Sequence, residues 1–160
     1  MRARIFLSWC HLDQSWKEKL LLDLRPALSS FTDLNVEWWE DSHLTCGEDL
    51  VPGIIDRLDE ADYGLLLLSN RYFNRPFIRR HELPRFVGPV ADKGSLPVAL
   101  TPLPSFGPHR DLGGIERQVV FTRNRRSFRD QHDGGRERFA IELADMIRRR
   151  ILGLNGYTAP

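Results

Sequence analysis

The sequence is poor in the features that mark secreted, membrane-spanning and nucleic-acid-binding proteins. It has only two cysteines in 160 residues, too few for the disulfide framework of a small secreted domain. Its longest strongly apolar run, residues 65–68, is far shorter than the roughly 20 residues needed to cross a bilayer. Lysine and arginine total 23 against 22 aspartates and glutamates, so net charge gives no general attraction to nucleic acid. We therefore expect a cytoplasmic protein with no membrane span and no direct nucleic-acid partner.

Several motifs that hold phosphates, metals or nucleophiles are also missing. The sequence has no phosphate-binding P-loop, no glycine fingerprint after its first strand and no G-x-S-x-G nucleophile elbow. His81 and Glu82 begin like a zinc-protease helix, but Arg85 stands where the second histidine is required. His43 and Cys46 form a lone pair of possible ligands with no second pair elsewhere. We expect no metal site and no resident cofactor.

What the sequence does contain is a regular alternation of strand and helix patterns. Apolar or alternating runs predict strands at residues 4–9, 36–41, 63–69, 96–100 and 118–122. Asp13 is a candidate N-cap for the first helix, and Asn74 with Pro76 opens a helical segment after the third strand. Apolar residues recur at helical spacing in three sets: Trp16, Leu20, Leu24 and Leu28; Leu50, Ile54 and Leu58; and Phe139, Leu143 and Ile147.

This alternation across the whole chain predicts an α/β fold, because successive strand–helix units force a parallel sheet with helices on both faces. With five strands, we expect a flavodoxin-like three-layer sandwich with a five-stranded parallel sheet in the order 2-1-3-4-5. We assign residues 1–152 to one domain and residues 153–160 to a tail or linker.

In that strand order, ligands bind in the crevice beyond the carboxyl ends of the first and third strands. The residues expected there offer aromatic rings, hydroxyls and carboxylates: Ser8, Trp9, Trp39, Asp41, Ser69, Tyr72, Phe77 and Glu82. Each has a structural alternative. Trp9 and Trp39 are equally compatible with packing, and a glutamate such as Glu82 is usually an exposed helix residue.

The same segments, in their order and spacing, resemble the Toll/interleukin-1 receptor (TIR) family over almost the whole chain. Residues 5–9 (IFLSW) with Asp13 are similar to its first conserved box, and residues 39–47 (WEDSHLTCG) to its second. Residues 62–72 are similar to its third strand, whose exit runs from a serine to a tyrosine, and residues 77–83 end in its Glu-Leu pair. Pro97 and Val98 match its fourth strand.

The resemblance implies an activity, because many TIR domains of bacteria, plants and one animal axon-degeneration protein cleave NAD with a glutamate at the position of Glu82. It implies an NAD glycohydrolase that releases nicotinamide and ADP-ribose, or a cyclic form, in prokaryotic antiphage immunity. Activation would follow self-assembly through TIR–TIR contacts at the loop from Ser42 to Gly47, with a fused or separate sensor domain. Glu82 would be catalytic, with NAD as substrate rather than cofactor. The substrate-binding candidates are Ser8, Trp9, Trp39, Asp41, Ser69, Tyr72 and Phe77.

The chain departs from the enzyme pattern in one position. Enzymes of the family often carry tryptophan four residues before the glutamate, where this sequence has Ile78, and Phe77 is the candidate replacement. Adaptor and receptor TIR domains of animal immunity commonly lack the glutamate, so a non-catalytic interaction module is the alternative. A receiver domain would need an aspartate where Ser69 ends the third strand. Pro84 predicts that the helix carrying Glu82 ends or kinks after Leu83.

Overall fold

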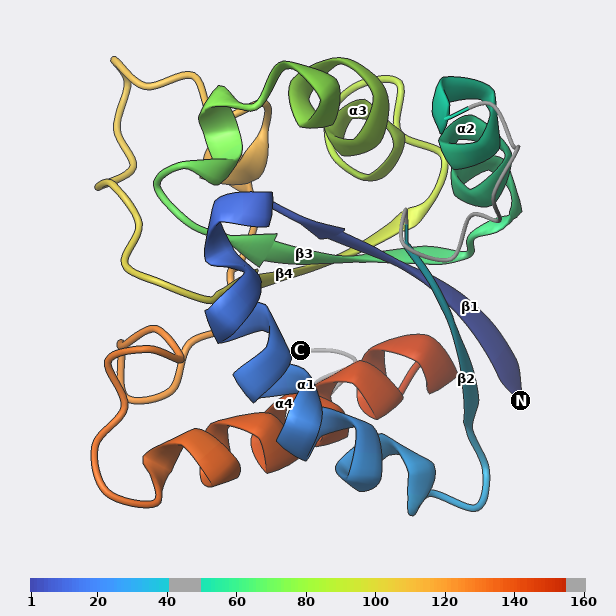
Figure 1. Ribbon diagram of the computed structural model, residues 1–160, viewed down its shortest axis with the longest axis vertical. Helices are drawn as coiled ribbons and strands as arrows, with labels where there is room; N and C mark the ends of the chain where they lie inside the picture. Colours follow the sequence, from blue (N-terminus) through green and yellow to red (C-terminus); the bar gives the residue numbers. More distant parts are fainter. Residues whose placement is uncertain (41–49, 155–160) are drawn as a thin grey trace.

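The computed structural model describes residues 1–40 and 50–154 as a parallel sheet covered by helices on both faces (Figure 1). The strands are β1 (Arg2–Trp9), β2 (Asn35–Trp39), β3 (Tyr63–Leu68) and β4 (Gly94–Ala99), in the order β2-β1-β3-β4. Helices α1 (Gln14–Ser29) and α4 (Gly135–Leu152) cover one face, and α2 (Leu50–Glu60) and α3 (Leu83–Phe86) lie on the other. The α/β class and the parallel three-layer architecture are confirmed.

The predicted fifth strand at residues 118–122 is wrong, and within residues 1–40 and 50–154 the sheet has four strands. Only Phe121 pairs with the sheet, through a single parallel bridge to Val98 beside β4. The Phe121 amide donates to the Pro97 carbonyl, and the Ala99 amide donates to the Phe121 carbonyl. Two residues earlier, Val119 is 92% exposed. The segment lies at the predicted edge, but it contacts the sheet through the half-buried Phe121 and a side-chain hydrogen bond from Ser95 to Gln118 rather than through a continuous strand ladder.

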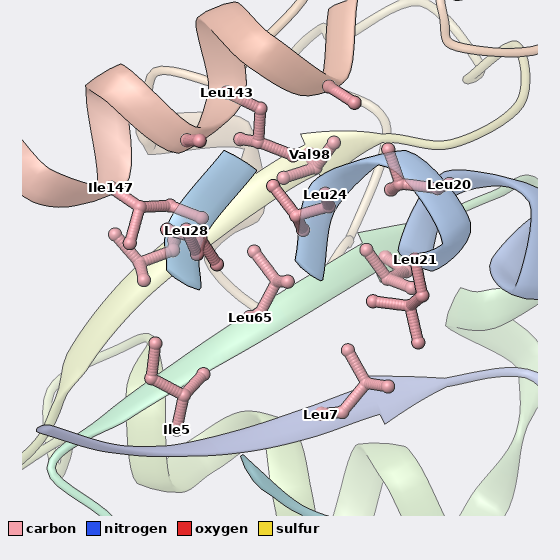
Figure 2. Packing of buried hydrophobic residues seen from close by; sticks show 14 of the residues in the cluster. Ile5, Leu7, Leu20, Leu21, Leu24, Leu28, Leu65, Val98, Leu143 and Ile147 are labelled. Atoms are coloured by element: carbon pink, nitrogen blue, oxygen red, sulfur yellow. The ribbon is translucent and has the colours of Figure 1, made fainter. Parts of the chain in front are cut away.

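Alternate residues of the central strands supply two separate cores, one on each face of the sheet. Ile5 and Leu65 point toward α1 and α4, where they pack with Leu24 and Leu143 (Figure 2). Their neighbours Phe6 and Leu66 belong to the core on the other face, together with Ile54, Leu58 and Phe86. Because both faces are covered, β3 is apolar along its whole length, as a central parallel strand is expected to be.

The first and last helices follow the predicted spacing closely. Leu20, Leu24 and Leu28 of α1 are 0–3% exposed, and the predicted apolar positions of α4 are completely buried. At the end of α1, the Ser29 and Ser30 hydroxyls donate to the carbonyls of Pro26 and Ala27, which satisfies acceptors in the last turn. In α2, Ile54 and Leu58 are buried as predicted, but Leu50 is 63% exposed.

The segment between β3 and β4 is helical but irregular. A 3-10 helix at Tyr72–Asn74 leads to Pro76, where a helix begins as predicted, and this helix contains a π-helical turn at Ile78–Glu82 before α3. The helix continues past Leu83 to Phe86, so of the predicted end or kink at Pro84 the end does not occur, and the irregularity lies in the π turn just before the proline. Pro84 has no amide hydrogen, so the i−4 hydrogen bond is lost there, and the wider π turn absorbs this irregularity.

Among the residues that the structure describes, no helix is both long and apolar enough to span a membrane.

Candidate functional site

A cavity of about 260 Å³ lies at the carboxyl end of β1, between that strand, α2 and the π-helical turn. The described residues of its lining are mainly apolar, with one carboxylate and a few other polar groups: Phe6, Leu7, Trp9, Cys10, His11, Leu50, Val51, Ile54, Arg75, Phe77, Ile78 and Glu82. Small-molecule pockets typically hold about 300–1,000 Å³. The cavity therefore matches part of a dinucleotide, such as one ring and its ribose, better than a whole one.

Glu82 places its carboxylate in this cavity although the residue is only 9% exposed. The Ser8 hydroxyl donates to Glu82 Oε1 at 2.6 Å, and Ser8 Oγ lies 2.8 Å from the Tyr72 hydroxyl oxygen. Ser8 and Tyr72 are completely buried. Burial, with a further contribution from the negative charge of Glu82, raises the pKa of the Tyr72 hydroxyl far above its ordinary value.

The π turn explains how a glutamate on a surface helix comes to be buried. Glu82 is its last residue, and the Leu83 amide donates to the Ile78 carbonyl five residues earlier. The extra residue per turn rotates the following side chains relative to an α-helix, and single π turns are frequent at functional sites. Ile78 and Glu82 were predicted to share one helix face, and both line the cavity.

Trp9 forms one wall of the cavity and is fixed by contacts within the protein. Its indole N–H donates to Glu40 Oε2 at 3.1 Å, and Lys17 Nζ lies 4.3 Å from the centre of its ring system. Lys17 and Glu40 also form a salt bridge of 3.1 Å, with side chains only 11% and 6% exposed. The His11 ring stacks on Trp9 at 4.8 Å. Trp9 thus presents a preorganised aromatic wall next to the imidazole.

Phe77 and Arg75 lie at the side of the cavity formed by the start of the irregular helix. Phe77 is half-buried, and its ring lies 4.8 Å from the ring of His81. Ile78, at the position where related enzymes carry tryptophan, is 5% exposed. Arg75 is exposed and brings a positive charge to the cavity. The one aromatic ring available to a ligand from this segment is therefore that of Phe77.

Ser69 lies away from Glu82, in a different set of contacts. Its hydroxyl donates to Asp13 Oδ2 at 2.5 Å and accepts from the Tyr72 amide at 3.2 Å. Asp13 was predicted to cap α1, but its carboxylate makes no capping bond and binds Ser69 instead. Both residues line a separate hollow of about 600 Å³ between the ends of β1, β3 and β4. The residues predicted to lie beyond the carboxyl ends of the first and third strands therefore belong to two cavities.

Of the two candidates contributed by the second strand, only Trp39 is among the described residues, and it does not line this cavity. Trp39 packs against the core under α2, with the Arg57 guanidinium 4.9 Å from its ring. Its indole nitrogen is buried and has no hydrogen-bond partner among the residues that the structure describes. Asp41 and the loop from Ser42 to Gly47 lie outside the described residues, as does most of the predicted tail.

Of the predicted substrate-binding and catalytic residues, Trp9, Phe77 and Glu82 line the cavity. The prediction missed Arg75, Ile54 and the buried pair of Lys17 with Glu40. Arg75 stands alone before a proline and belongs to no sequence motif that indicates a binding site. Lys17 lies in α1 and Glu40 directly follows β2, so the pair forms only when the helix packs against the strand. The sequence alone gives no sign of it.

A family model described as TIR domain matches residues 5–146, well over half of the chain. No curated protein matches the chain. The matched range includes every described residue of the cavity around Glu82.

Proposed function

The chain belongs to the TIR domain family, and we propose that it is an NAD glycohydrolase that cleaves the bond between nicotinamide and ribose. The single observation that carries the proposal is the carboxylate of Glu82 in the cavity. Apolar and aromatic walls surround that carboxylate, and TIR domains include both NAD-cleaving and non-catalytic members. The acidic residue in the cavity favours the first class.

The chemistry of the bond explains why one carboxylate is sufficient. The nicotinamide of NAD is a pyridinium, so it takes the bonding electron pair and leaves as a neutral molecule without a general acid. Positive charge then develops on C1′ and the ring oxygen of the ribose. A fixed negative charge beside that sugar lowers the energy of this oxocarbenium-like state, as carboxylates do in glycosidases. Water adds to C1′ and loses one proton, which gives ADP-ribose.

In this proposal, different cavity residues contact the nicotinamide ring, the ribose and the pyrophosphate of NAD. Trp9 and Phe77 present aromatic surfaces on which the nicotinamide ring can pack, and Glu82 faces the ribose. Arg75 adds a positive charge suited to the pyrophosphate. The cavity volume fits the reacting half of the molecule, so the adenosine half would extend beyond it.

Assembly is a further part of the proposal. TIR domains commonly self-associate through TIR–TIR contacts, and we propose that copies joined at the loop from Ser42 to Gly47 form the active species. The biological setting we propose is prokaryotic antiphage immunity, with a sensor domain that controls assembly. No resident cofactor or metal takes part in the proposed reaction.

The test is incubation of NAD with free protein and with protein clustered on a multivalent support, followed by chromatographic separation of the products. The proposal predicts nicotinamide in equal amount to ADP-ribose, or to a cyclic product, with faster release from clustered protein. A folded, clustered protein that leaves NAD intact would support the alternative of a non-catalytic interaction module.

A further inference from the structure

Three side chains from three segments form a continuous chain of hydrogen-bonding groups that ends at the cavity. Tyr72 lies in the 3-10 helix after β3, Ser8 near the end of β1, and Glu82 in the π turn. Only Glu82 lines the cavity, whereas Ser8 and Tyr72 are completely buried behind it. Ser8 and Tyr72 were predicted as substrate-binding residues. Because both are completely buried, a substrate in the cavity cannot contact them.

The number of protons available decides which group donates in each of the two hydrogen bonds. A serine hydroxyl has one proton, and here it is donated to Glu82 Oε1 at 2.6 Å. In the 2.8 Å contact with Tyr72, Ser8 therefore accepts, and the phenol donates. The phenol retains its proton because burial and the nearby carboxylate both disfavour the phenolate. The order of donation runs from Tyr72 through Ser8 to Glu82.

We propose that this chain makes Ser8 and Tyr72 positioning residues, which hold Glu82 in its cavity-facing orientation and favour its ionised form. Removing a carboxylate from water is costly unless hydrogen-bond donors replace the solvent. A donor chain that polarises along its length strengthens its last hydrogen bond. The catalytic consequence rests on the function proposed above, whereas the effect on ionisation does not.

In the part of the chain that the structure describes, the other titratable groups that line the cavity come from two further segments. Cys10 and His11 follow β1, and Arg75 precedes the irregular helix. Among the described residues, α2 contributes only Leu50, Val51 and Ile54 to the lining. The His11 imidazole lines the same cavity, so the experiments below are repeated in a His11→Gln background, which retains only the Glu82 carboxylate as the group under test.

The first experiment compares pH profiles of nicotinamide release by clustered protein carrying Ser8→Ala, Tyr72→Phe or both. We expect Ser8→Ala to lower kcat about tenfold at neutral pH, the loss of one hydrogen bond to a charged group, with a KM near that of the parent. The acid limb of its profile should move to higher pH. Tyr72→Phe should shift the limb in the same direction by less. The double variant should resemble Ser8→Ala, since Tyr72 acts through Ser8.

The matched control is Ser95→Ala, which removes another buried hydroxyl of the sheet, bonded to Gln118 at 3.0 Å. It should leave the acid limb in place. Profiles of the Ser8 and Tyr72 variants that run parallel to the parent profile would overturn the proposal. So would additive losses in the double variant, because they would show that Tyr72 acts independently of Ser8.

A second readout does not depend on activity. In protein labelled with ¹³C at glutamate side chains, the Glu82 resonance is assigned by its absence in Glu82→Gln and followed from pH 3 to 9. The proposal predicts a titration midpoint at higher pH in Ser8→Ala than in the parent. An unchanged midpoint would overturn the donor chain even if NAD is cleaved. A shifted midpoint in a protein that leaves NAD intact would support the chain and contradict the glycohydrolase.

Discussion

The Ser8 hydroxyl lies 2.6 Å from Glu82 Oε1, although 74 residues separate the two in the sequence. The parallel order of the sheet brings them together, because β1 lies beside β3 and the segment after β3 carries Glu82. The contact holds an ionisable group at the wall of a largely apolar cavity. Fold and candidate chemistry are therefore linked at one hydrogen bond, and the predictions below probe its surroundings.

Phe77 should determine how tightly the nicotinamide ring is held. Ile78 offers no aromatic surface, so Phe77→Ala removes the ring supplied by this helix and should raise KM roughly tenfold, the equivalent of about 1.4 kcal/mol. Phe77→Trp should keep KM within about threefold of the parent. Steady-state kinetics of NAD cleavage measure both variants, and a KM unchanged in Phe77→Ala would remove this residue from the binding site.

The buried phenol of Tyr72 should make the protein less stable at alkaline pH. Its raised pKa means that above about pH 10 the unfolded chain loses the tyrosine proton while the native state keeps it. The native state then binds more protons, so its contribution to stability is complete below that pH and is lost as pH rises further. The loss should approach about 1.4 kcal/mol per pH unit.

Urea unfolding of the parent and Tyr72→Phe between pH 9 and 11 measures this effect. The stability advantage of the parent over the variant should shrink as pH rises. Tyr63→Phe is the control, because it removes the phenol of a half-buried tyrosine in β3. A parent–variant difference that stays constant over this range would show that the Tyr72 phenol ionises normally.

Gly64 should be intolerant of a side chain because of Phe86. A Cβ at position 64 would lie 2.7 Å from atoms of the Phe86 ring, closer than real contacts allow. Gly64→Ala should therefore reduce the free energy of unfolding by about 1–3 kcal/mol. In a Phe86→Leu background, which removes the ring, the same change should cost clearly less. Equal costs in the two backgrounds, measured by urea unfolding, would contradict this packing.

Losing Lys17 alone should destabilise the protein more than losing the charges of Lys17 and Glu40 together. Both side chains are largely buried, at 11% and 6% exposure. Lys17→Met removes the Lys17 cation from beside the Glu40 carboxylate and should reduce stability by about 3–5 kcal/mol. Adding Glu40→Gln removes the negative charge that Lys17 balanced and should restore much of the loss. Thermal and urea unfolding test this, and a double variant no more stable than Lys17→Met would argue against charge burial as the cause.

The layers of the fold could be predicted from the sequence because its periodic patterns are strong. The four-residue spacing in α1 and α4 indicates helices with one buried face, and the short apolar run of β3 is typical of a central parallel strand. The fifth strand could not be distinguished in this way. Its short apolar run resembles a strand, but in the fold it anchors a loop through Phe121. A π turn likewise leaves no periodic signal, since it changes the spacing for a single turn.

The site could be predicted less completely, for a physical reason. Strand order indicates which loop ends meet, and this was enough to bring Trp9, Phe77 and Glu82 to one cavity. It does not indicate which polar side chains turn inward beneath the surface. The sequence therefore predicted Ser8 and Tyr72 to contact a ligand, although they lie behind the Glu82 carboxylate. It also predicted Asp13 to cap a helix, although its carboxylate binds Ser69.

The most direct test of the account is the rate of nicotinamide release from NAD by clustered protein, compared between the parent and Glu82→Gln. Glutamine keeps the size and shape of the side chain but carries no charge, so circular dichroism and thermal unfolding should confirm a folded protein. The account predicts steady release by the parent and a loss of at least a hundredfold in the variant. Equal release by both proteins would contradict the role of the Glu82 carboxylate.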